Sequence, residues 1–286
     1  MKASTLSLPF RARRRVLPGF GLSLGISLTF VSLVLLLPLT GLVGQLKGLS
    51  ALEYWHIISE PRLVASYVTT LGAAAVAAVV NAVFGLLLAW VLVRYEFPGK
   101  RLLDALMDLP FALPTAVAGI TLATLYSSNG WMGKLLEPLG LDVAYTWVGI
   151  ALAMAFTSIP FVVRTVQPVL EDLPSEIDEA AMTLGANDGV AFRRVILPHL
   201  WPALVTGTGL AFVRSLGEFG AVIFIAGNMP YETEITSLMI FVKLQEYDYV
   251  GASAIASVVL ATSLALLLAI NLWQGRFIRR LHGGQG

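Results

Sequence analysis

Residues 164–198 read RTVQPVLEDLPSEIDEAAMTLGANDGVAFRRVILP, a long polar insertion in a chain whose other connections are mostly short. Pro174 followed by Glu176 favours a helix start, because acidic side chains are stabilised at the partially positive N-terminus of a helix. Gly185 lies where a helix would end in a left-handed residue, and Asn187 or the aspartate after it can cap a second short helix. The insertion is therefore predicted to be a helix–turn–helix. On composition alone, it is equally a docking surface or a solvated amphipathic hairpin.

The sequence around this insertion is too apolar for a water-facing surface. Of its 286 residues, 57% are hydrophobic and 13% are charged, and the mean hydropathy is +0.79. A soluble domain carries about 25% charged residues, so lipid must cover much of this chain. The absence of cysteine excludes disulfides, thiolate metal sites and cysteine nucleophiles. The net charge of +1 offers no field that would draw nucleic acid.

Six stretches free of Asp, Glu, Lys and Arg are long enough to cross a bilayer, because a helix needs about 20 apolar residues to span roughly 30 Å of hydrocarbon. They are 16–46, 63–93, 109–133, 143–163, 195–213 and 249–275. The fifth is predicted to continue to residue 227 and so to contain Arg214 and Glu218. Pro110 and Pro114 are predicted to bend or start a helix in the third. We therefore expect an all-α membrane protein with six transmembrane helices.

Lysine and arginine orient these helices, since cytoplasmic loops of membrane proteins are enriched in both residues. With the N-terminus inside, 14 of them are cytoplasmic, 4 are external and Arg214 lies within a span. The cytoplasmic residues are Lys2, Arg11, Arg13, Arg14, Arg15, Arg94, Lys100, Arg101, Arg164, Arg193, Arg194, Arg276, Arg279 and Arg280. The external residues are Lys47, Arg62, Lys134 and Lys243. Both termini are thus expected in the cytoplasm. The first helix is expected to be an uncleaved anchor, because it is about twice as long as a signal-peptide core.

A motif inside the polar insertion distinguishes between its two interpretations. Glu179, Ala180 and Ala181 are followed after three residues by Gly185, and after nine more by VILP, which ends in Leu197 and Pro198. This pattern resembles the EAA loop of ABC-importer permeases, with one departure, a valine at the first position of the final I-x-L-P. In that family the loop docks on an ATPase subunit, which implies that the six residues named here contact such a partner. The chain has no G-x-x-x-x-G-K-[ST] run, so ATP and Mg²⁺ are expected on a separate polypeptide, and no cofactor is expected on this chain.

Further stretches resemble one branch of that family, the T-type permeases of sulfate/thiosulfate importers. They are DLPFALPTAVAG at 108–119, RSLGEFG at 214–220, FIAGNMP at 224–230, NGW at 129–131 and KLQEYDY at 243–249. RSLGEFG is shared with molybdate permeases, so a molybdate or tungstate permease stays an alternative. The resemblance implies a bacterial inner-membrane complex with two ATPase copies, a second homologous permease, a periplasmic sulfate/thiosulfate-binding protein and surrounding lipid. It favours a heterodimer of permeases over a homodimer.

The resemblance also implies that the chain is one permease domain, 1–286. It would comprise a basic cytoplasmic tail over 1–15, a six-helix core over 16–275 and the EAA coupling loop over 164–198.

Two charged residues inside the membrane need an explanation, because an ionisable group there costs roughly 2.5–3.5 kcal/mol on insertion scales. Arg214 and Glu218 are four residues apart and are predicted to share a helix face. Either Arg214 lines an anion path with Glu218 holding its rotamer, or the two form a structural pair that never meets substrate. Thr115 and Ser127 on the third span either supply neutral donors to a passing oxyanion or bond their own backbone.

Three rival classes fit the sequence less well. An ion-coupled secondary anion transporter would need a free intramembrane carboxylate, and Glu218 already has Arg214 as a partner. A scaffolding protein would not need the EAA loop. An enzyme would need a reactive cluster, but no HExxH run and no paired intramembrane carboxylates occur, and His199 has no second metal ligand at suitable spacing. Asp108 is expected to cap the third helix or to pair with Lys100 or Arg101.

Overall fold

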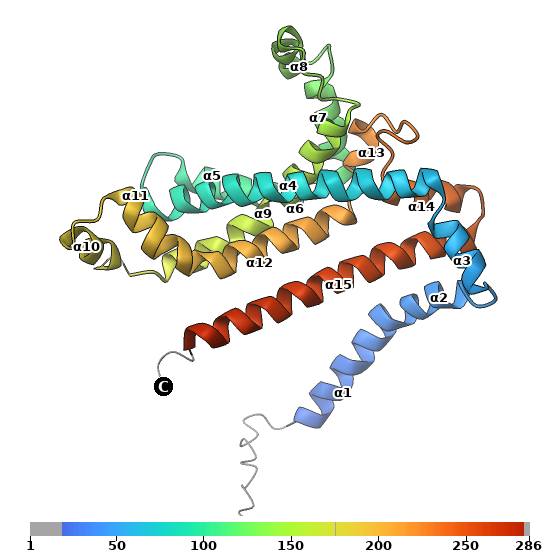
Figure 1. Ribbon diagram of the computed structural model, residues 1–286, viewed down its shortest axis with the longest axis horizontal. Coiled ribbons are helices and arrows are strands. Elements are labelled where there is room, and N and C mark those ends of the chain that lie inside the picture. The colour runs from blue at the N-terminus through green and yellow to red at the C-terminus, as the bar shows by residue number, and fades with distance from the viewer. Residues whose placement is uncertain (1–18, 175, 283–286) are drawn as a thin grey trace, which may run out of the picture. The chain divides into compact units, whose positions relative to one another are not determined.

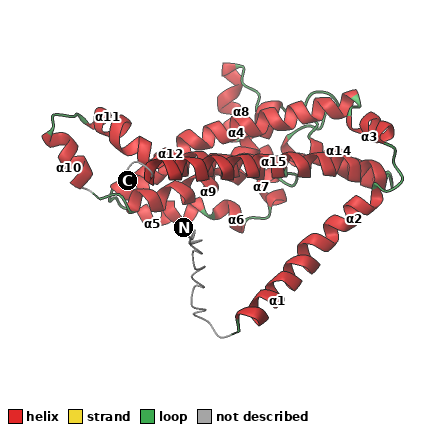
Figure 2. Ribbon diagram, turned by 60° about the horizontal axis from the view of Figure 1, so that its bottom comes forward, coloured by secondary structure: helices red, strands yellow, loops and turns green. Residues whose placement is uncertain are grey.

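The computed structural model describes residues 19–174 and 176–282, and every regular element within these ranges is a helix (Figures 1 and 2). The chain divides into two compact units, one ending at Gly48 and one running from Leu49 to the C-terminus. The predicted basic tail, 1–15, and Ser175 of the polar insertion lie outside the described residues. Five helices are long and apolar enough to cross a membrane within the described ranges.

The first unit is a single apolar helical rod. It comprises α1 (Phe20–Val31), a π-helical turn (Ser32–Leu36) and α2 (Leu37–Gln45). The wider turn precedes Pro38, whose missing N–H and ring prevent an ordinary helical hydrogen bond to the preceding turn. The three segments together form the first candidate span, Phe20–Gln45, in agreement with the predicted stretch 16–46.

The second unit begins with a short capped helix and the longest apolar helix of the core. In α3 (Ala51–Ile58), Ser50 and Glu53 form a reciprocal capping box, which satisfies backbone donors that the first turn leaves free. The next helix is α4 (Pro61–Arg94), which matches the predicted span 63–93 closely. At the far end of the unit, α15 (Tyr249–His282) matches the predicted span 249–275 and extends beyond it.

The third predicted span, 109–133, is broken instead of continuous. It follows α5 (Lys100–Met107) and comprises α6 (Leu109–Ala112), α7 (Thr115–Tyr126) and α8 (Trp131–Leu136), with a 3₁₀ turn at Glu137–Leu139. Leu113 adopts an extended conformation because Pro114 disfavours the helical region for the residue before it. No piece is long enough to count among the five candidate spans, although α7 is apolar.

The fourth and fifth predicted spans have different ends from those expected. The fourth, predicted as 143–163, is α9 (Trp147–Glu171), so the first part of the polar insertion continues this helix. The fifth begins earlier, since α11 (Asp188–Ala191), a π-helical turn (Phe192–Ile196) and α12 (Leu197–Leu216) form one continuous helix. Pro198 therefore does not separate a second short helix from the span. The π turn accommodates this proline, and the Leu197 N–H reaches back to the Phe192 carbonyl.

The fifth span also ends earlier than predicted. It stops at Leu216 instead of continuing to 227, so Glu218 lies in the turn after the helix and not on its face. Two shorter helices, α13 (Val222–Ile225) and α14 (Thr236–Gln245), then lead to α15.

The core of the second unit lies where α4, α9 and α12 pack side by side (Figure 1). Gly85 of α4 and Gly207 of α12 both face Val162 of α9, so glycine on either side allows the backbones to approach closely. A buried polar group connects the same helices: Asn81 donates to Ser158 at 2.8 Å, and Ser215 donates to Ser158 at 3.2 Å. Such hydrogen bonds stabilise helix association where water is absent.

Candidate functional site

The polar insertion projects from the core as a helical hairpin (Figure 1). Its first arm is α10 (Glu176–Thr183), and the arm ends at Gly185, whose φ of +81° is left-handed as predicted. The Ala186 N–H bonds the Ala181 carbonyl and the Gly185 N–H bonds the Met182 carbonyl, which is the Schellman arrangement. Asn187 caps the second arm by accepting a hydrogen bond from the Val190 N–H at 2.9 Å. The predicted first helix, the glycine turn and the Asn187 cap are thus confirmed, whereas the second helix continues into the fifth span instead of ending before Pro198.

The predicted coupling residues divide between the tip of the hairpin and its base. Glu179 and Ala180 are exposed, Ala181 is buried against the hairpin, and Gly185 forms the turn. Beside them, Leu184 is 88% exposed, so the tip of the hairpin also presents an apolar side chain.

At the base of the hairpin, Leu197 is half-buried and Pro198 is exposed, more than two helical turns from Gly185 along the chain. Ile196 beside them is buried in the core formed by α4, α9 and α12. The VILP end of the motif therefore anchors the hairpin, whereas the EAA-G end presents its surface.

A second cluster lies close to the base of the hairpin, around Arg164 of α9. Its Nε and Nη2 donate to the two Asp108 carboxylate oxygens at 2.8 and 2.7 Å. Its Nη1 donates to Asp104 at 2.6 Å and to the Gln167 amide oxygen at 2.8 Å, and Nη2 also reaches the Asp104 carbonyl at 2.9 Å. The guanidinium thus clamps α5 against α9.

The expected role of Asp108 is corrected by this cluster. Asp108 makes no side-chain cap hydrogen bond, and its carboxylate pairs with Arg164 instead of Lys100 or Arg101. Lys100 pairs with Glu96 at 2.6 Å. Nothing in the sequence signals the Arg164–Asp108 contact, because the two residues are 56 positions apart.

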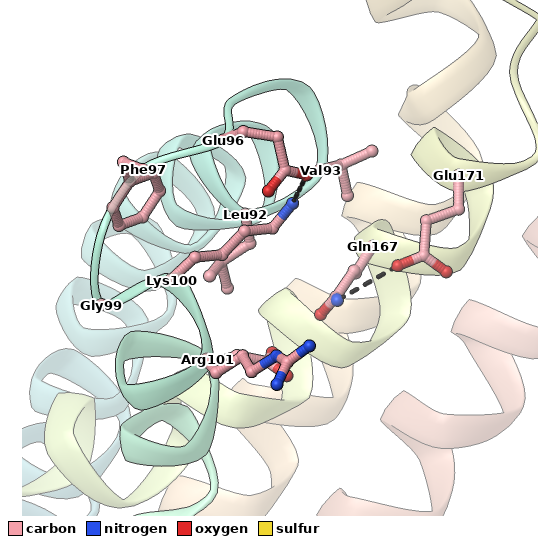
Figure 3. Close-up of a pocket in the computed structure, with 10 residues that line it drawn as sticks. Leu92, Val93, Glu96, Phe97, Gly99, Lys100, Arg101, Gln167 and Glu171 are labelled. Carbon is pink, nitrogen blue, oxygen red and sulfur yellow. Dashed lines mark hydrogen bonds and ion pairs between the residues drawn. The ribbon is translucent and has the colours of Figure 1, made fainter.

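A polar pocket of about 660 Å³ opens beside this clamp, between the end of α4, α5 and the end of α9 (Figure 3). Asp104 and Gln167 belong to both the clamp and the pocket wall. Two further pairs cross its surface, Lys100 with Glu96 and Gln167 with Glu171. The pocket is lined by Leu92, Val93, Glu96, Phe97, Gly99, Lys100, Arg101, Asp104, Gln167 and Glu171.

The two charged residues predicted inside the membrane do meet. Arg214 Nη1 lies 2.8 Å from Glu218 Oε2, although Glu218 follows the helix. The Glu218 side chain is 1% exposed and that of Arg214 is 35% exposed, so the carboxylate is enclosed and the guanidinium has an open side. The Ala221 N–H donates to Glu218 Oε1 at 3.1 Å, which fixes the carboxylate from its own turn.

The two hydroxyls predicted with this pair lie apart from each other. Thr115, at the start of α7, touches Gly220 just after Glu218, and a Cβ on Gly220 would overlap its hydroxyl. Ser127 follows the other end of α7, about 18 Å away at 1.5 Å per residue. Its hydroxyl donates to the Thr124 carbonyl at 3.1 Å, which is the local backbone bond considered above. The structure therefore brings Thr115, but not Ser127, to the Arg214 turn.

An ion pair at the opposite end of α4 was missed by sequence reasoning. Arg62 binds Glu234 through two hydrogen bonds of 2.8 and 2.7 Å, and the Glu234 side chain is 4% exposed. Nearby, the Thr236 N–H donates to Thr70 at 2.9 Å. These contacts hold the start of α14 on α4, and their separations of 172 and 166 positions hide them from sequence patterns. No cluster of three or more metal-binding side chains occurs among the residues that the structure describes.

Comparison with known proteins agrees with this architecture. Residues 81–283 match the family described as the binding-protein-dependent transport system inner membrane component. The chain is 65% identical over 270 residues to the sulfate transport system permease protein CysT of Salmonella typhimurium, covering 94% of this chain and 98% of that protein. It is 47% identical to the CysT protein of Synechococcus elongatus, covering 87% of this chain and 90% of that protein.

Solved structures share the fold at low sequence identity. A bacterial alginate ABC transporter in complex with an alginate pentasaccharide-bound periplasmic protein has a matching chain with a TM-score of 0.73 and 19% identity, covering 90% of this chain and 94% of that one. An inward-facing MetNI methionine ABC transporter matches with a TM-score of 0.54 and 18% identity, covering 81% of this chain and 99% of that one. The hairpin with its glycine turn, the long apolar helices and these matches together show that the chain belongs to the inner-membrane permease family of binding-protein-dependent transport systems.

Proposed function

We propose that this chain is a permease subunit of an ATP-driven importer that carries sulfate or thiosulfate across the bacterial inner membrane. The observation that carries the proposal is the 65% identity to sulfate transport permeases over nearly the full length of both proteins. The exposed hairpin supports the proposal that a separate ATPase drives transport. The permease itself has no nucleotide-binding run and needs a surface on which an ATPase can act.

The tip of the hairpin is the proposed ATPase-docking surface. Glu179, Ala180 and Leu184 present their side chains outward, and Gly185 allows the tight turn that exposes them. Leu197 and Pro198 would act indirectly, through the anchored base. Two ATPase copies, which bind ATP and Mg²⁺, and a second homologous permease complete the proposed complex. A periplasmic sulfate/thiosulfate-binding protein is supported by the fold neighbour that was solved with its periplasmic protein.

The proposed topology is a single permease domain over 1–286 with six crossings and both termini in the cytoplasm. The five long helices supply five crossings, and the broken segment α6–α7 supplies the third. Non-helical backbone is tolerated at membrane depth where protein encloses it. Here Gly119 of α7 packs against the Ala221 backbone, which supports such enclosure. The excess of lysine and arginine on one side supports the orientation.

Arg214 is the proposed anion contact, with Glu218 holding it and Thr115 beside the same turn. Its partial exposure leaves donors available to a dianion, while the enclosed carboxylate keeps the guanidinium in place. Ser127 would meet the anion only at another point along α7. Arg214→Gln should abolish uptake in a complex that still assembles; loss of assembly would instead assign the pair a purely structural role.

Uptake of radiolabelled sulfate by cells with the gene deleted and then restored tests the substrate assignment. We expect uptake to disappear, to return, and to be blocked by excess thiosulfate but not by molybdate. Competition by molybdate would reassign the permease to molybdate or tungstate. Unchanged sulfate uptake, with other sulfate carriers removed, would refute the substrate while leaving membership of the permease family intact.

A further inference from the structure

A chain of polar contacts runs from the base of the hairpin to the start of the broken third segment. Glu171, the last residue of α9, accepts a hydrogen bond from Gln167 at 3.2 Å, and Gln167 accepts one from Arg164 at 2.8 Å (Figure 3 shows the first). Arg164 then binds Asp104 and Asp108. We call these five residues the Arg164 network. It joins the end of α9 to α5 and to the start of the broken third segment.

The geometry of the Arg164 network makes it a stiff connection. A guanidinium bound to both oxygens of a carboxylate fixes the distance and the relative orientation of the two groups, which a single ion contact does not. Arg164 makes this paired contact with Asp108 and adds the side chain and the carbonyl of Asp104. A shift of α9 along its axis must therefore move the α5–α6 junction or break several charge-assisted hydrogen bonds.

Both ends of the network lie beside regions assigned a function above. The hairpin arm α10 starts at Glu176, five residues after Glu171. At the other end, Asp108 immediately precedes α6, and α7 follows after Pro114. Thr115 and Gly119 of α7 pack against residues 220 and 221, in the turn that contains Glu218. The network thus connects the proposed ATPase-docking hairpin to the helix that supports the Arg214–Glu218 pair.

We propose that the Arg164 network makes α5, α6 and α7 follow movements of the hairpin, so that breaking it uncouples ATP hydrolysis from anion transport. This inference rests on the proposed function, in which the hairpin docks on an ATPase. The five residues are positioning residues, since none of them is assigned a contact with the anion.

Weakening the Arg164 network should leave the global fold intact. The side chains of Arg164 and Asp108 are 31% and 52% exposed, so water can solvate either group when the pair is broken. The core that holds α4, α9 and α12 together is apolar and does not include them. Asp108→Asn keeps the shape of the side chain and removes its charge, so it weakens the network without creating a cavity.

The test uses the complete complex reconstituted in proteoliposomes, with the binding protein present. ATP hydrolysis and sulfate transport are both measured on the same preparation. Asp108→Asn should raise the number of ATP molecules hydrolysed per sulfate transported by roughly fivefold or more, the lower range of couplings between protein sites. Arg164→Lys, which keeps the charge but loses the planar fork, should give a smaller increase. Glu96→Gln is the matched control, because Glu96 lines the same pocket and pairs with Lys100, outside the Arg164 network. Its number of ATP molecules hydrolysed per sulfate transported should equal that of the unmodified complex.

Three results would overturn the inference. The first is an Asp108→Asn complex whose two activities fall together with an unchanged ratio. The second is a variant that fails to assemble, which would make the network structural. The third is an Arg164→Lys/Asp108→Asn double variant whose ratio of ATP hydrolysed to sulfate transported rises by the product of the two single effects, since partners in one network should not act independently. If the unmodified complex shows no ATP hydrolysis dependent on sulfate and binding protein, the proposed function fails instead.

Discussion

One added methyl group at Gly207 should loosen the contact between α9 and α12. The Cβ of an alanine there would lie 2.9 Å from Val162 Cα and 3.0 Å from the Phe161 carbonyl oxygen. Both atoms belong to the backbone of α9, so no side-chain rotation can relieve the contact. Carbon atoms pack best at about 3.5–4.0 Å, so the two helices must separate by roughly half an ångström or more.

The size of the effect follows from two opposing terms. Alanine gains about 1 kcal/mol over glycine in helix propensity. Overfilling a packed interior costs about 1–3 kcal/mol. The upper part of that range applies, because a Cβ on Gly85 would lie 2.8 Å from Val162 on its other side, which leaves α9 no room to retreat towards α4. Gly207→Ala should therefore destabilise the protein by about 1–2 kcal/mol.

Gly209 provides a matched control on the same helix. The Cβ of Gly209→Ala would meet side-chain atoms of Ile270, with Cδ1 nearest and Cγ1 at 3.0 Å, and a side chain can change its rotamer where backbone cannot move. This variant should be neutral or gain up to about 1 kcal/mol. Thermal unfolding in detergent measures both: Gly207→Ala should lower Tm by about 2–8 °C, at about 2–4 °C per kcal/mol for a chain of this size. If Gly207→Ala melts at or above Gly209→Ala, the three helices do not pack as described.

Three further changes test separate contacts. Asn81→Leu removes the donor to Ser158 and should destabilise the purified permease by about 1–3 kcal/mol, since it leaves a buried hydroxyl without that partner; an unchanged Tm would contradict the buried network. Glu234→Gln removes the charge and leaves one acceptor oxygen, so at most one of the two hydrogen bonds from Arg62 can remain. It should cost about 1–2 kcal/mol, moderated by the partial exposure of the arginine, with faster proteolysis near the start of α14 as the readout. Gly185→Ala places alanine in the left-handed region, at a cost of about 1–2 kcal/mol, and should reduce the amount of ATPase that co-purifies with the permease. Full recovery of the ATPase would show that docking does not need the glycine turn.

Features set by neighbouring residues could be predicted from the sequence. Gly185 ends its helix in a left-handed conformation, and Asn187 caps the next one, because both depend on backbone geometry within a few residues. The long apolar helices could also be predicted, because the length of an uncharged stretch decides whether it can span the membrane. Pro114 marks the break in the third segment, although the sequence left open whether a proline bends a helix or starts a new one.

Helix ends and partners were predicted less well, because they depend on what packs against them. The fifth span ends at Leu216 since the following turn is held by tertiary contacts: Ser237 donates to the Glu218 carbonyl at 2.7 Å, and α7 packs on Gly220 and Ala221. The pattern of apolar residues in the sequence does not reveal such contacts, so the sequence predicts that the span continues to residue 227.

Arg62 and Arg164, which each bind both oxygens of one carboxylate, show the same limit of sequence-based prediction for charged residues. Arg62 and Arg164 were both placed near membrane boundaries by counting charges, but each chose an acid 172 or 56 positions away instead of a neighbour in sequence. A guanidinium needs two oxygens in one plane to satisfy its fork, and only the packed helices present them. Close sequence neighbours such as Lys100 and Glu96 pair as single, exposed contacts. The residues that fix one segment on another are therefore those whose partners the linear pattern conceals, and in this chain they lie beside the hairpin and at the start of α14.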